Sequence, residues 1–228
     1  MINVKEEIIK NSDPKYKEFH KNIVPGIEDF YGVRMPVLRN ISKQIINDDW
    51  RSFLEQPVTC YEETMIRSQI IAGAKMNIDE RLELSRMFMP EINNWAICDN
   101  FCGDWKVNNK DKEKLWNYCL ELIETDDEFM MRVSAVMMLC HFLDNEYIDN
   151  VLSLMSTKYH PGYYYKMGAA WTLSFAYIKF PEKTETFIFA DTLDDEIRNK
   201  SIQKICDSFR VENNDKERLK KKKKELMR

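Results

Sequence analysis

The chain has 228 residues, of which 44% are apolar and 32% charged, and its formal net charge is −4. This length fits one large domain or two small ones, and the apolar content is sufficient for a packed core, which excludes a wholly disordered chain. Glycine and proline are scarce, at 6 and 7 residues, which disfavours a turn-rich β-sandwich or barrel, and the sequence has no glycine-rich phosphate-binding loop.

Membrane insertion and secretion are not indicated. No apolar run approaches the roughly 20 residues that cross a membrane. The N-terminal segment MINVKEEIIK lacks the pattern of a signal peptide. We therefore expect a soluble, intracellular protein with a cytoplasmic location and no membrane partner.

Apolar residues recur with the 3.6-residue period of amphipathic helices, and no segment has a convincing strand pattern. Helix starts are indicated by Asp-Pro before Lys15, and by Asp79, Asn93, Asp127 and Pro181. The predicted helices span residues 3–10, 14–23, 35–47, 60–76, 79–89, 93–106, 110–124, 127–142, 145–157, 163–179, 182–190 and 195–209, followed by a charged tail helix.

The predicted helices contain a sequence pattern that recurs at a nearly constant interval. A polar or charged residue leads an apolar helical stretch at intervals of 33, 32, 33, 34 and 34 residues. The six positions are Arg34, Arg67, Asp99, Arg132, Lys166 and Lys200. Such a period is typical of stacked helix pairs. It predicts an all-α fold, an α-α superhelix of the HEAT-like or armadillo-like class with about six helix pairs.

Five of these six positions carry a cation. If the positions are equivalent, the cations form a basic strip on one helix row. The alternative is that they are ordinary interhelix ion-pair or capping residues, and the spacing alone does not separate the two interpretations.

The C-terminal end differs from the rest in charge. Its last 13 residues, KERLKKKKKELMR, carry a net +6, so the preceding 215 residues carry −10. We expect a single repeat domain over residues 1–215 and a basic tail over 216–228. The run Lys220–Lys224 could neutralise phosphates. The alternative is a solvated helix end or a frayed tail.

The segment NNWAICDNFCGDW, at residues 93–105, is the most informative. On a helix, Ile97, Cys98, Phe101 and Trp105 form a stripe that should face the core. A second stripe, about 120° away at 100° per residue, holds Trp95, Asp99, Cys102 and Lys106. An indole beside a carboxylate off the core face suits a cation. The alternative is a partly buried Trp95 and an Asp99 that pairs with a neighbouring cation.

Two later helices each carry one charge in an apolar stretch. Arg132, in FMMRVSAVMMLCHFL, should be nearly buried and needs an anion, either a carboxylate such as Asp99 or a phosphate. Lys166 lies in YYYKMGAAWTLSFAYI, where Gly168 allows close helix approach and Trp171 is either a core or a ligand residue.

The six cysteines do not form a CxxC motif, and disulfides are not expected. Cys98 and Cys102 could face a metal at i, i+4 spacing, but no nearby histidine completes a ligand set. No metal or other cofactor is predicted.

The sequence resembles the DNA alkylation repair family, the HEAT-like alkylpurine DNA glycosylases of AlkD type. The segments that carry the resemblance are YGVRMPVLRNISKQI at 31–45, YEETMIRSQIIAGAKM at 61–76, NWAICDNFCGDWK at 94–106, MRVSAVMML at 131–139, KMGAAWTLSFAYIKFP at 166–181 and NKSIQKICDSFRV at 199–211. The first and third are the most specific. The resemblance implies six HEAT-like repeats curved around duplex DNA and removal of cationic bases such as 3-methyladenine and 7-methylguanine, without everting the base into a pocket.

Residue by residue, the resemblance implies that Asp99 is the catalytic carboxylate. Trp95 and Trp171 match the aromatics that hold the deoxyribose of the lesion, and Arg132 matches a basic residue near the carboxylate and the DNA backbone. Our candidates for DNA-backbone contacts are Arg34, Lys106, Lys166 and Arg210.

We therefore expect a monomeric, monofunctional DNA glycosylase, a hydrolase without strand cleavage because no Schiff-base lysine is assigned. The alternative is a non-catalytic HEAT-like scaffold that binds nucleic acid or protein. A scaffold needs only the basic strip, whereas the enzyme needs the Asp99 carboxylate in its cleft.

Overall fold

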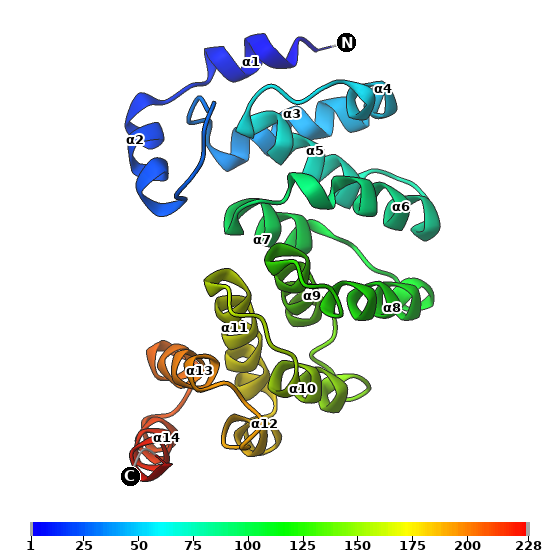
Figure 1. Ribbon diagram of the computed structural model, residues 1–228. Helices are drawn as coiled ribbons and strands as arrows, with labels where there is room; N and C mark the ends of the chain where they lie inside the picture. The colour runs from blue at the N-terminus through cyan, green and yellow to red at the C-terminus, as the bar shows by residue number, and fades with distance from the viewer. Residues whose placement is uncertain (1, 227–228) are drawn as a thin grey trace. The chain divides into compact units, whose positions relative to one another are not determined.

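The computed structural model describes residues 2–226, which form an all-α fold without β-strands, as the periodicity predicts. The chain divides into two compact units, one extending to Leu115 and the other beginning at Trp116 (Figure 1). The boundary falls within helix α8 (Lys112–Ile123). The predicted division into a domain of 1–215 and a tail of 216–228 stays a prediction.

The first unit contains seven α-helices in its described residues besides the start of α8. They are α1 (Val4–Lys10), α2 (Pro14–Ile23), α3 (Met35–Ile46), α4 (Trp50–Glu55), α5 (Tyr61–Gly73), α6 (Ile78–Phe88) and α7 (Trp95–Asp104), with short 3₁₀ turns at Met89–Glu91 and Asn109–Asp111. Helix α5 lies between α3 and α7 and also packs against α4 and α6. Buried side chains such as Leu38, Ile66 and Phe101 form the core, each contributing about 1.5–3 kcal/mol by burial.

A buried carboxylate fixes the segment that joins α2 to α3. Glu62 of α5 is 1% exposed, and its carboxylate accepts hydrogen bonds from the backbone N–H groups of Tyr31, Gly32 and Val33 at 2.8–3.2 Å. Hydrogen bonds to a charged acceptor are among the stronger ones in proteins. The segment is thereby held against α5.

The part of the second unit that the structure describes contains the rest of α8 and six further helices. They are α9 (Glu128–His141), α10 (Ile148–Thr157), α11 (Tyr163–Lys179), α12 (Pro181–Ile188), α13 (Asp195–Asp207) and α14 (Asn213–Leu226). Helix α11 lies between α9 and α13. The hydroxyl of Thr172 in α11 donates to the carbonyl of Ala135 in α9 at 2.8 Å, across this close contact.

The predicted repeat positions fall on successive odd-numbered helices. Arg34 directly precedes α3, and the other five lie within α5, α7, α9, α11 and α13. The repeat in the sequence therefore reflects a repeat of helix pairs in the structure, consistent with the predicted α-α superhelix.

Three of the cations at these positions make internal ion pairs. Arg34 pairs with Asp13, Arg67 with Glu91 and Lys166 with Glu196, at 2.6–2.9 Å. For these three residues the structure favours the interhelix ion-pair interpretation over an open basic strip.

Candidate functional site

Helix α7 presents Trp95 and Asp99 one turn apart. The Asn94 side chain caps the helix by accepting from the backbone N–H groups of Ala96 and Ile97, both at 3.0 Å. The predicted core stripe of Ile97, Cys98, Phe101 and Trp105 is buried, as predicted. Trp95 and Asp99 are half-buried.

The prediction that Cys102 lies off the core face is wrong. The helical period groups it with Trp95 and Asp99 off the core face, but it is 0% exposed. The reason is that α7 is contacted from two sides: it packs against α5, and its Phe101 ring lies 5.4 Å from that of Phe88 in α6. The buried face of α7 is therefore wider than a single stripe.

Trp95 is fixed by a contact between distant parts of the chain. Its indole N–H donates to the backbone carbonyl of Ile23, at the end of α2, at 3.0 Å. On α2 itself, Phe19 and Ile23 are 58% and 42% exposed, one turn apart. This pair is not among the residues predicted from sequence; its signal is two large apolar residues at i, i+4 in a helix that is otherwise mostly polar.

The two basic candidates of the first unit differ in environment. Both side chains are exposed. The Arg34 guanidinium donates to Asp13 at 2.8 and 3.1 Å and lies 4.8 Å from the centre of the Tyr16 ring. The backbone N–H of Tyr16, together with Arg34, holds the pKa of Asp13 below its usual value. Lys106 lies two residues after the end of α7, in the segment that follows the helix.

Arg132 is 5% exposed, which confirms its predicted burial. Its guanidinium donates to the backbone carbonyl of Tyr164 in α11 at 2.6 Å. Gly168 leaves the space for this arrangement, because a Cβ at that position would lie 3.2 Å from the Cγ of Arg132. The close approach predicted from Gly168 thus serves to seat Arg132 against α11.

Lys166 is not an open cation. It is 8% exposed, and its ammonium lies 2.9 Å from a Glu196 carboxylate oxygen and 3.9 Å from one of Asp194. The hydrogen bond with Glu196 raises the pKa of Lys166 above its ordinary value. The structure thus uses this side chain to join α11 to the start of α13.

Trp171 belongs to a row of side chains at the surface of the second unit. It is half-buried, and its ring meets that of Phe175 edge-on at 5.8 Å. The guanidinium of Arg210 lies 5.5 Å from the centre of the Phe175 ring. Arg210 is exposed, so this candidate backbone contact is accessible and lies on the same aromatic row as Trp171.

The structure therefore groups the candidates by unit. Trp95 and Asp99 share α7, while Arg132 and Trp171 belong to neighbouring helices of the second unit. That the four act on one substrate stays a prediction.

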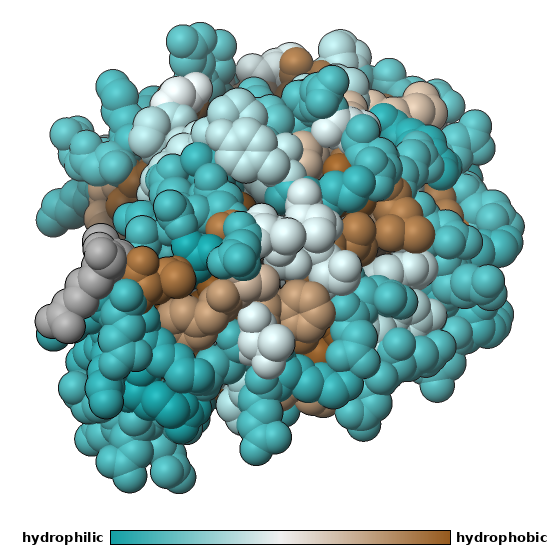
Figure 2. Space-filling view, turned by 60° about the horizontal axis from the view of Figure 1, so that its bottom comes forward, coloured by the Kyte–Doolittle hydropathy of each residue, from teal (hydrophilic) through white to brown (hydrophobic). Residues whose placement is uncertain are grey.

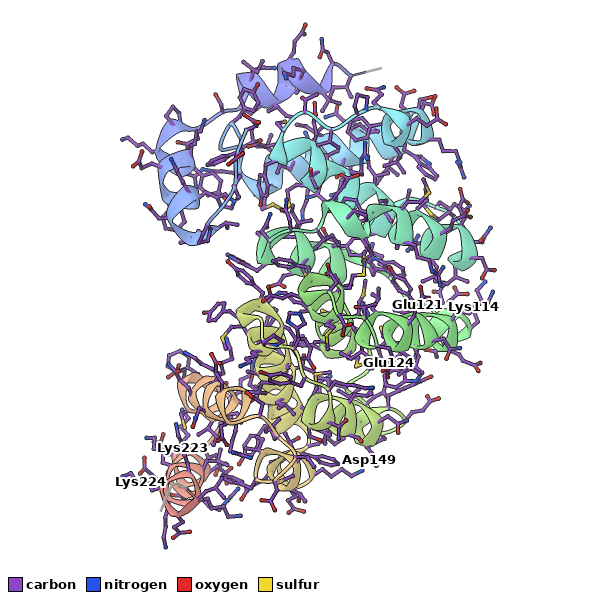
Figure 3. The ribbon with its side chains drawn as sticks, viewed as in Figure 1. Lys114, Glu121, Glu124, Asp149, Lys223 and Lys224 are labelled. Atoms are coloured by element: carbon purple, nitrogen blue, oxygen red, sulfur yellow. The ribbon has the colours of Figure 1, made fainter. Side chains whose placement is uncertain are left out.

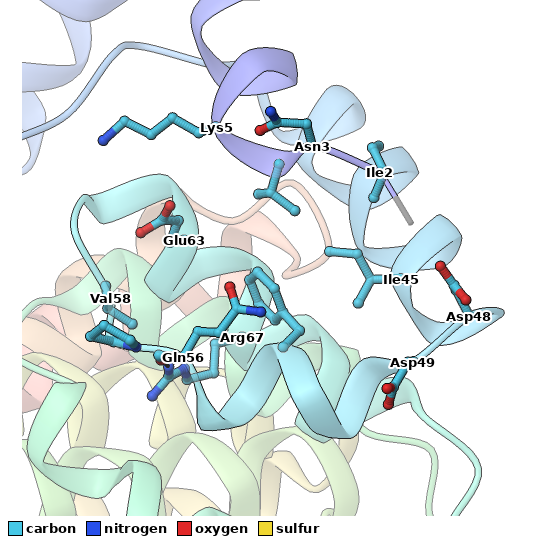
Figure 4. A pocket seen from close by; sticks show the side chains of 13 residues that line it. Ile2, Asn3, Lys5, Ile45, Asp48, Asp49, Gln56, Val58, Glu63 and Arg67 are labelled. Atoms are coloured by element: carbon cyan, nitrogen blue, oxygen red, sulfur yellow. Dashed lines mark hydrogen bonds between the residues drawn. The ribbon is translucent and has the colours of Figure 1, made fainter.

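A cavity of about 290 Å³ lies elsewhere in the first unit (Figure 4). Its lining comes from α1, the end of α3, α4, the segment after α4, and the Glu63 and Arg67 side chains of α5. Neither Trp95 nor Asp99 contributes to it. The other candidate residues are also absent from its lining, so this cavity is separate from the candidate site residues.

Hydrophilic side chains cover most of the face in Figure 2, with smaller hydrophobic areas between them. Within residues 2–226, none of the helices is long and apolar enough to cross a membrane. Among the same residues, no group of three or more His, Cys, Asp or Glu side chains is arranged to hold a metal ion.

The comparisons with known proteins agree with the resemblance seen in the sequence. The sequence profile of a family described as DNA alkylation repair enzyme matches residues 4–204. A search of curated proteins found no match to the chain. The profile covers most of the chain, including α7 with Trp95 and Asp99, and supports a role in DNA repair. The chain therefore belongs to the DNA alkylation repair enzyme family.

Proposed function

We propose that the protein is a monofunctional DNA glycosylase that hydrolyses the N-glycosidic bond of positively charged alkylated purines, such as 3-methyladenine and 7-methylguanine, in duplex DNA. The observation that carries the proposal is the placement of Asp99. It is a half-buried carboxylate one helical turn from the indole of Trp95. The opposite, core-facing side of the same helix is buried through Ile97 and Phe101. Membership of a DNA alkylation repair enzyme family supports the proposal that alkylated DNA is the substrate.

The chemistry needs few groups. As the C1′–N bond breaks, its electron pair moves to the cationic purine, which leaves as a neutral base. Positive charge then develops on the sugar, in an oxocarbenium-like state. A water forms the new C1′–O bond and gives up one proton. Asp99 stabilises the developing charge, orients this water and receives the proton before passing it to solvent.

The aromatic residues favour the same charge. The indole faces of Trp95 and Trp171 attract the cationic lesion and the positive sugar through their π systems. Trp95 is held by its hydrogen bond to Ile23, so its ring needs little ordering when substrate binds. Arg132 supplies a fixed positive charge for the DNA backbone.

Phosphate contacts rest most directly on the exposed cations Lys106 and Arg210. Arg34 can exchange its half-buried partner Asp13 for a phosphate, because the Arg34 side chain is exposed and ion pairs at a protein surface are weak. Lys166 would have to leave a shielded ion pair, so among the four candidates we expect it to contribute least to DNA binding.

The test is release of 3-methyladenine and 7-methylguanine from methylated duplex DNA. We expect Asp99→Asn to lower the rate by about 10²–10³-fold, the usual effect of removing one electrostatic stabiliser. The matched control is Asp104→Asn on the same helix, which removes a half-buried carboxylate and its ion pair with the exposed Arg39, and should leave the rate unchanged. Circular dichroism of both variants controls for folding.

The product gives a second readout. A monofunctional enzyme leaves abasic sites, so strands should break only after alkaline treatment. Equal release by wild type and Asp99→Asn would remove Asp99 from the mechanism. Tight duplex binding with no release would favour the non-catalytic scaffold instead.

A further inference from the structure

Helix α14 carries the densest positive charge in the described chain. Its residues 213–226 include seven Lys or Arg and three Asp or Glu, a net +4. The family profile ends at residue 204, before this helix begins. Neither the family assignment nor the proposed catalytic residues therefore account for it.

One face of α14 is docked onto the second unit. Leu219 is 0% exposed and packs in a core with Tyr177, Ile202 and Ile205. Arg218 donates to the Tyr177 hydroxyl at 3.0 Å and to Glu185 at 2.8 Å. The Lys222 ammonium also bonds Glu185. These contacts fix the rotation of the helix about its axis, so it is not a frayed tail.

The remaining lysines form a stripe on another face. At 100° per residue, Lys216, Lys220, Lys223 and Lys224 fall within an arc of about 100°. We call these four the basic stripe. Lys220 and Lys224 are exposed, and Lys216 and Lys223 half-buried. Figure 3 shows the labelled Lys223 and Lys224 side chains on α14.

Acidic neighbours are mostly kept to the flank of the stripe. Glu217 and Glu225 fall on the arc that adjoins the stripe on one side. Lys221 lies on the same arc, 4.0 Å from Glu225. Within the described part of α14, Glu217 pairs with one stripe lysine, Lys220, at 2.8 Å. Both partners of that pair are exposed, so the interaction is weak and a phosphate can replace the carboxylate.

We propose that the basic stripe binds the phosphate backbone of duplex DNA and extends the DNA contact of the repair enzyme beyond the family region. This inference rests on the proposed function. From Lys216 to Lys224 the helix rises about 12 Å, at 1.5 Å per residue. A duplex carries one negative charge per about 1.7 Å of its axis, so it offers several phosphates over that length.

The composition of the stripe favours DNA over other partners. Lysine is depleted at protein–protein interfaces, which rely on aromatic and arginine anchors that the stripe lacks. A membrane-surface helix needs an apolar face to insert. On α14, Leu219 is buried in the core of the second unit, and Leu226 is the one exposed apolar residue among the helix residues that the structure describes.

The experiment measures binding to an undamaged duplex by fluorescence anisotropy between 50 and 200 mM salt. The stripe variant combines Lys216→Gln, Lys220→Gln, Lys223→Gln and Lys224→Gln. The control combines Lys43→Gln, Lys75→Gln, Lys110→Gln and Lys183→Gln, which removes the same charge from exposed lysines on other elements. Arg218, Leu219 and Lys222 stay in place, so α14 remains docked.

We expect the slope of log K against log salt to become shallower by about 2–4 in the stripe variant, because each phosphate that the protein neutralises accounts for about 0.9 of the slope. Its affinity at 100 mM salt should drop at least about tenfold, against less than about threefold for the control. Equal slopes for the stripe variant and the control would overturn the inference.

The inference and the proposed function fail separately. Normal base release with unchanged salt slopes would refute only the stripe. A reduced slope in a protein that releases no base would refute the glycosylase and keep the stripe. Loss of binding to phosphatidylserine vesicles alone, with duplex affinity unchanged, would assign the stripe to a membrane and overturn our proposal.

Discussion

Arg132 of α9 lies directly against Gly168 of α11, where a Cβ would come within 3.2 Å of the arginine Cγ. That separation is tight for two carbon atoms, so a side chain at position 168 must move the arginine. Position 168 therefore controls where the Arg132 guanidinium sits, although Gly168 itself has no side chain to contact DNA.

Gly168→Ala should affect activity more than stability. The added methyl group shifts Arg132 by a few tenths of an ångström, while alanine favours the helix by about 1 kcal/mol over glycine. We expect a melting temperature close to that of wild type and base release slowed about 3- to 10-fold. Gly73→Ala is the control, because its nearest neighbour is Ile46 Cδ1 at 3.7 Å. Base release at the wild-type rate in Gly168→Ala would show that activity does not depend on the exact position of Arg132.

Gly32 should be among the least replaceable glycines. Its φ is +81°, and a Cβ there would lie 2.8 Å from the backbone carbonyl oxygen of Asp13 and 2.6 Å from Lys17 Cβ. Gly32→Ala should lower the free energy of unfolding by about 2–4 kcal/mol, because backbone strain and a clash add.

Gly26 separates these two effects. Its φ of +82° is nearly the same, but no atom lies within 4 Å of a Cβ built there. Gly26→Ala should cost only about 1–2 kcal/mol, the strain alone. Urea denaturation of both variants measures the difference, and equal losses of stability would show that the approach of Gly32 to α2 is not tight.

His20 should make the protein less stable in mild acid. It is 8% exposed among the Tyr16, Phe30 and Tyr61 rings, and burial lowers its pKa below the ordinary value of 6.5. In the unfolded chain the imidazole is protonated as the pH falls through 6.5, while in the folded chain it stays neutral to a lower pH. The unfolded state therefore binds more protons, and stability falls as the pH drops below 6.5.

Denaturation of wild type and His20→Phe at pH 7.5 and 5.5 measures this effect. The phenyl ring fits among the same aromatic neighbours but cannot take a proton. We expect the free energy of unfolding to fall more in wild type than in the variant between the two pH values. An equal decrease in both proteins would assign the acid sensitivity to other groups.

Glu185 should hold α14 in place at neutral pH. Burial opposes its charge, but the hydrogen bonds from Arg218 and Lys222 outweigh burial and lower its pKa below 4.5. The stabilisation is therefore present above pH 4.5 and is lost as the pH falls towards the lower pKa of the folded state. Glu185→Gln should cost about 1–3 kcal/mol at pH 7, and the difference from wild type should shrink below pH 4.5.

Glu182→Gln is the matched control for this substitution. It changes an exposed carboxylate on the same helix, α12, and should have little effect at either pH. A wild-type-like stability of Glu185→Gln at pH 7 would contradict the role assigned to the carboxylate. Denaturant titrations at pH 7 and pH 4 provide the measurement.

Local patterns predicted most of the helices. Two helix starts differ by one or two residues from those that the sequence indicates, because α6 and α7 are capped by Asn77 and Asn94, whereas the predicted starts are Asp79 and Asn93. Helix α4 is not among the predicted helices, because Trp50–Glu55 is too short to show a helical period. Its cap, in which the Asp49 side chain accepts from the Ser52 backbone N–H, is a local signal that could have indicated it.

The candidate site is harder to predict from the sequence than the helices, because its contacts join residues that are far apart in the chain. Ile23 and Trp95 are separated by 72 positions, and Lys166 and Glu196 by 30. A helical period gives the direction of the core from one helix but not which neighbours cover its other sides. This is why the sequence favours Lys166 as a DNA contact, although its ammonium forms an ion pair with the Glu196 carboxylate, thirty residues later.

The hydrogen bond between the Trp95 indole and the Ile23 carbonyl also provides a way to observe motion. Its proton can exchange with deuterated solvent only when the end of α2 separates from α7. The exchange lifetime of the indole N–H resonance in a nitrogen-15 NMR spectrum therefore reports how often the end of α2 separates from Trp95. A longer lifetime after addition of duplex DNA would show that the bound state holds these two elements together.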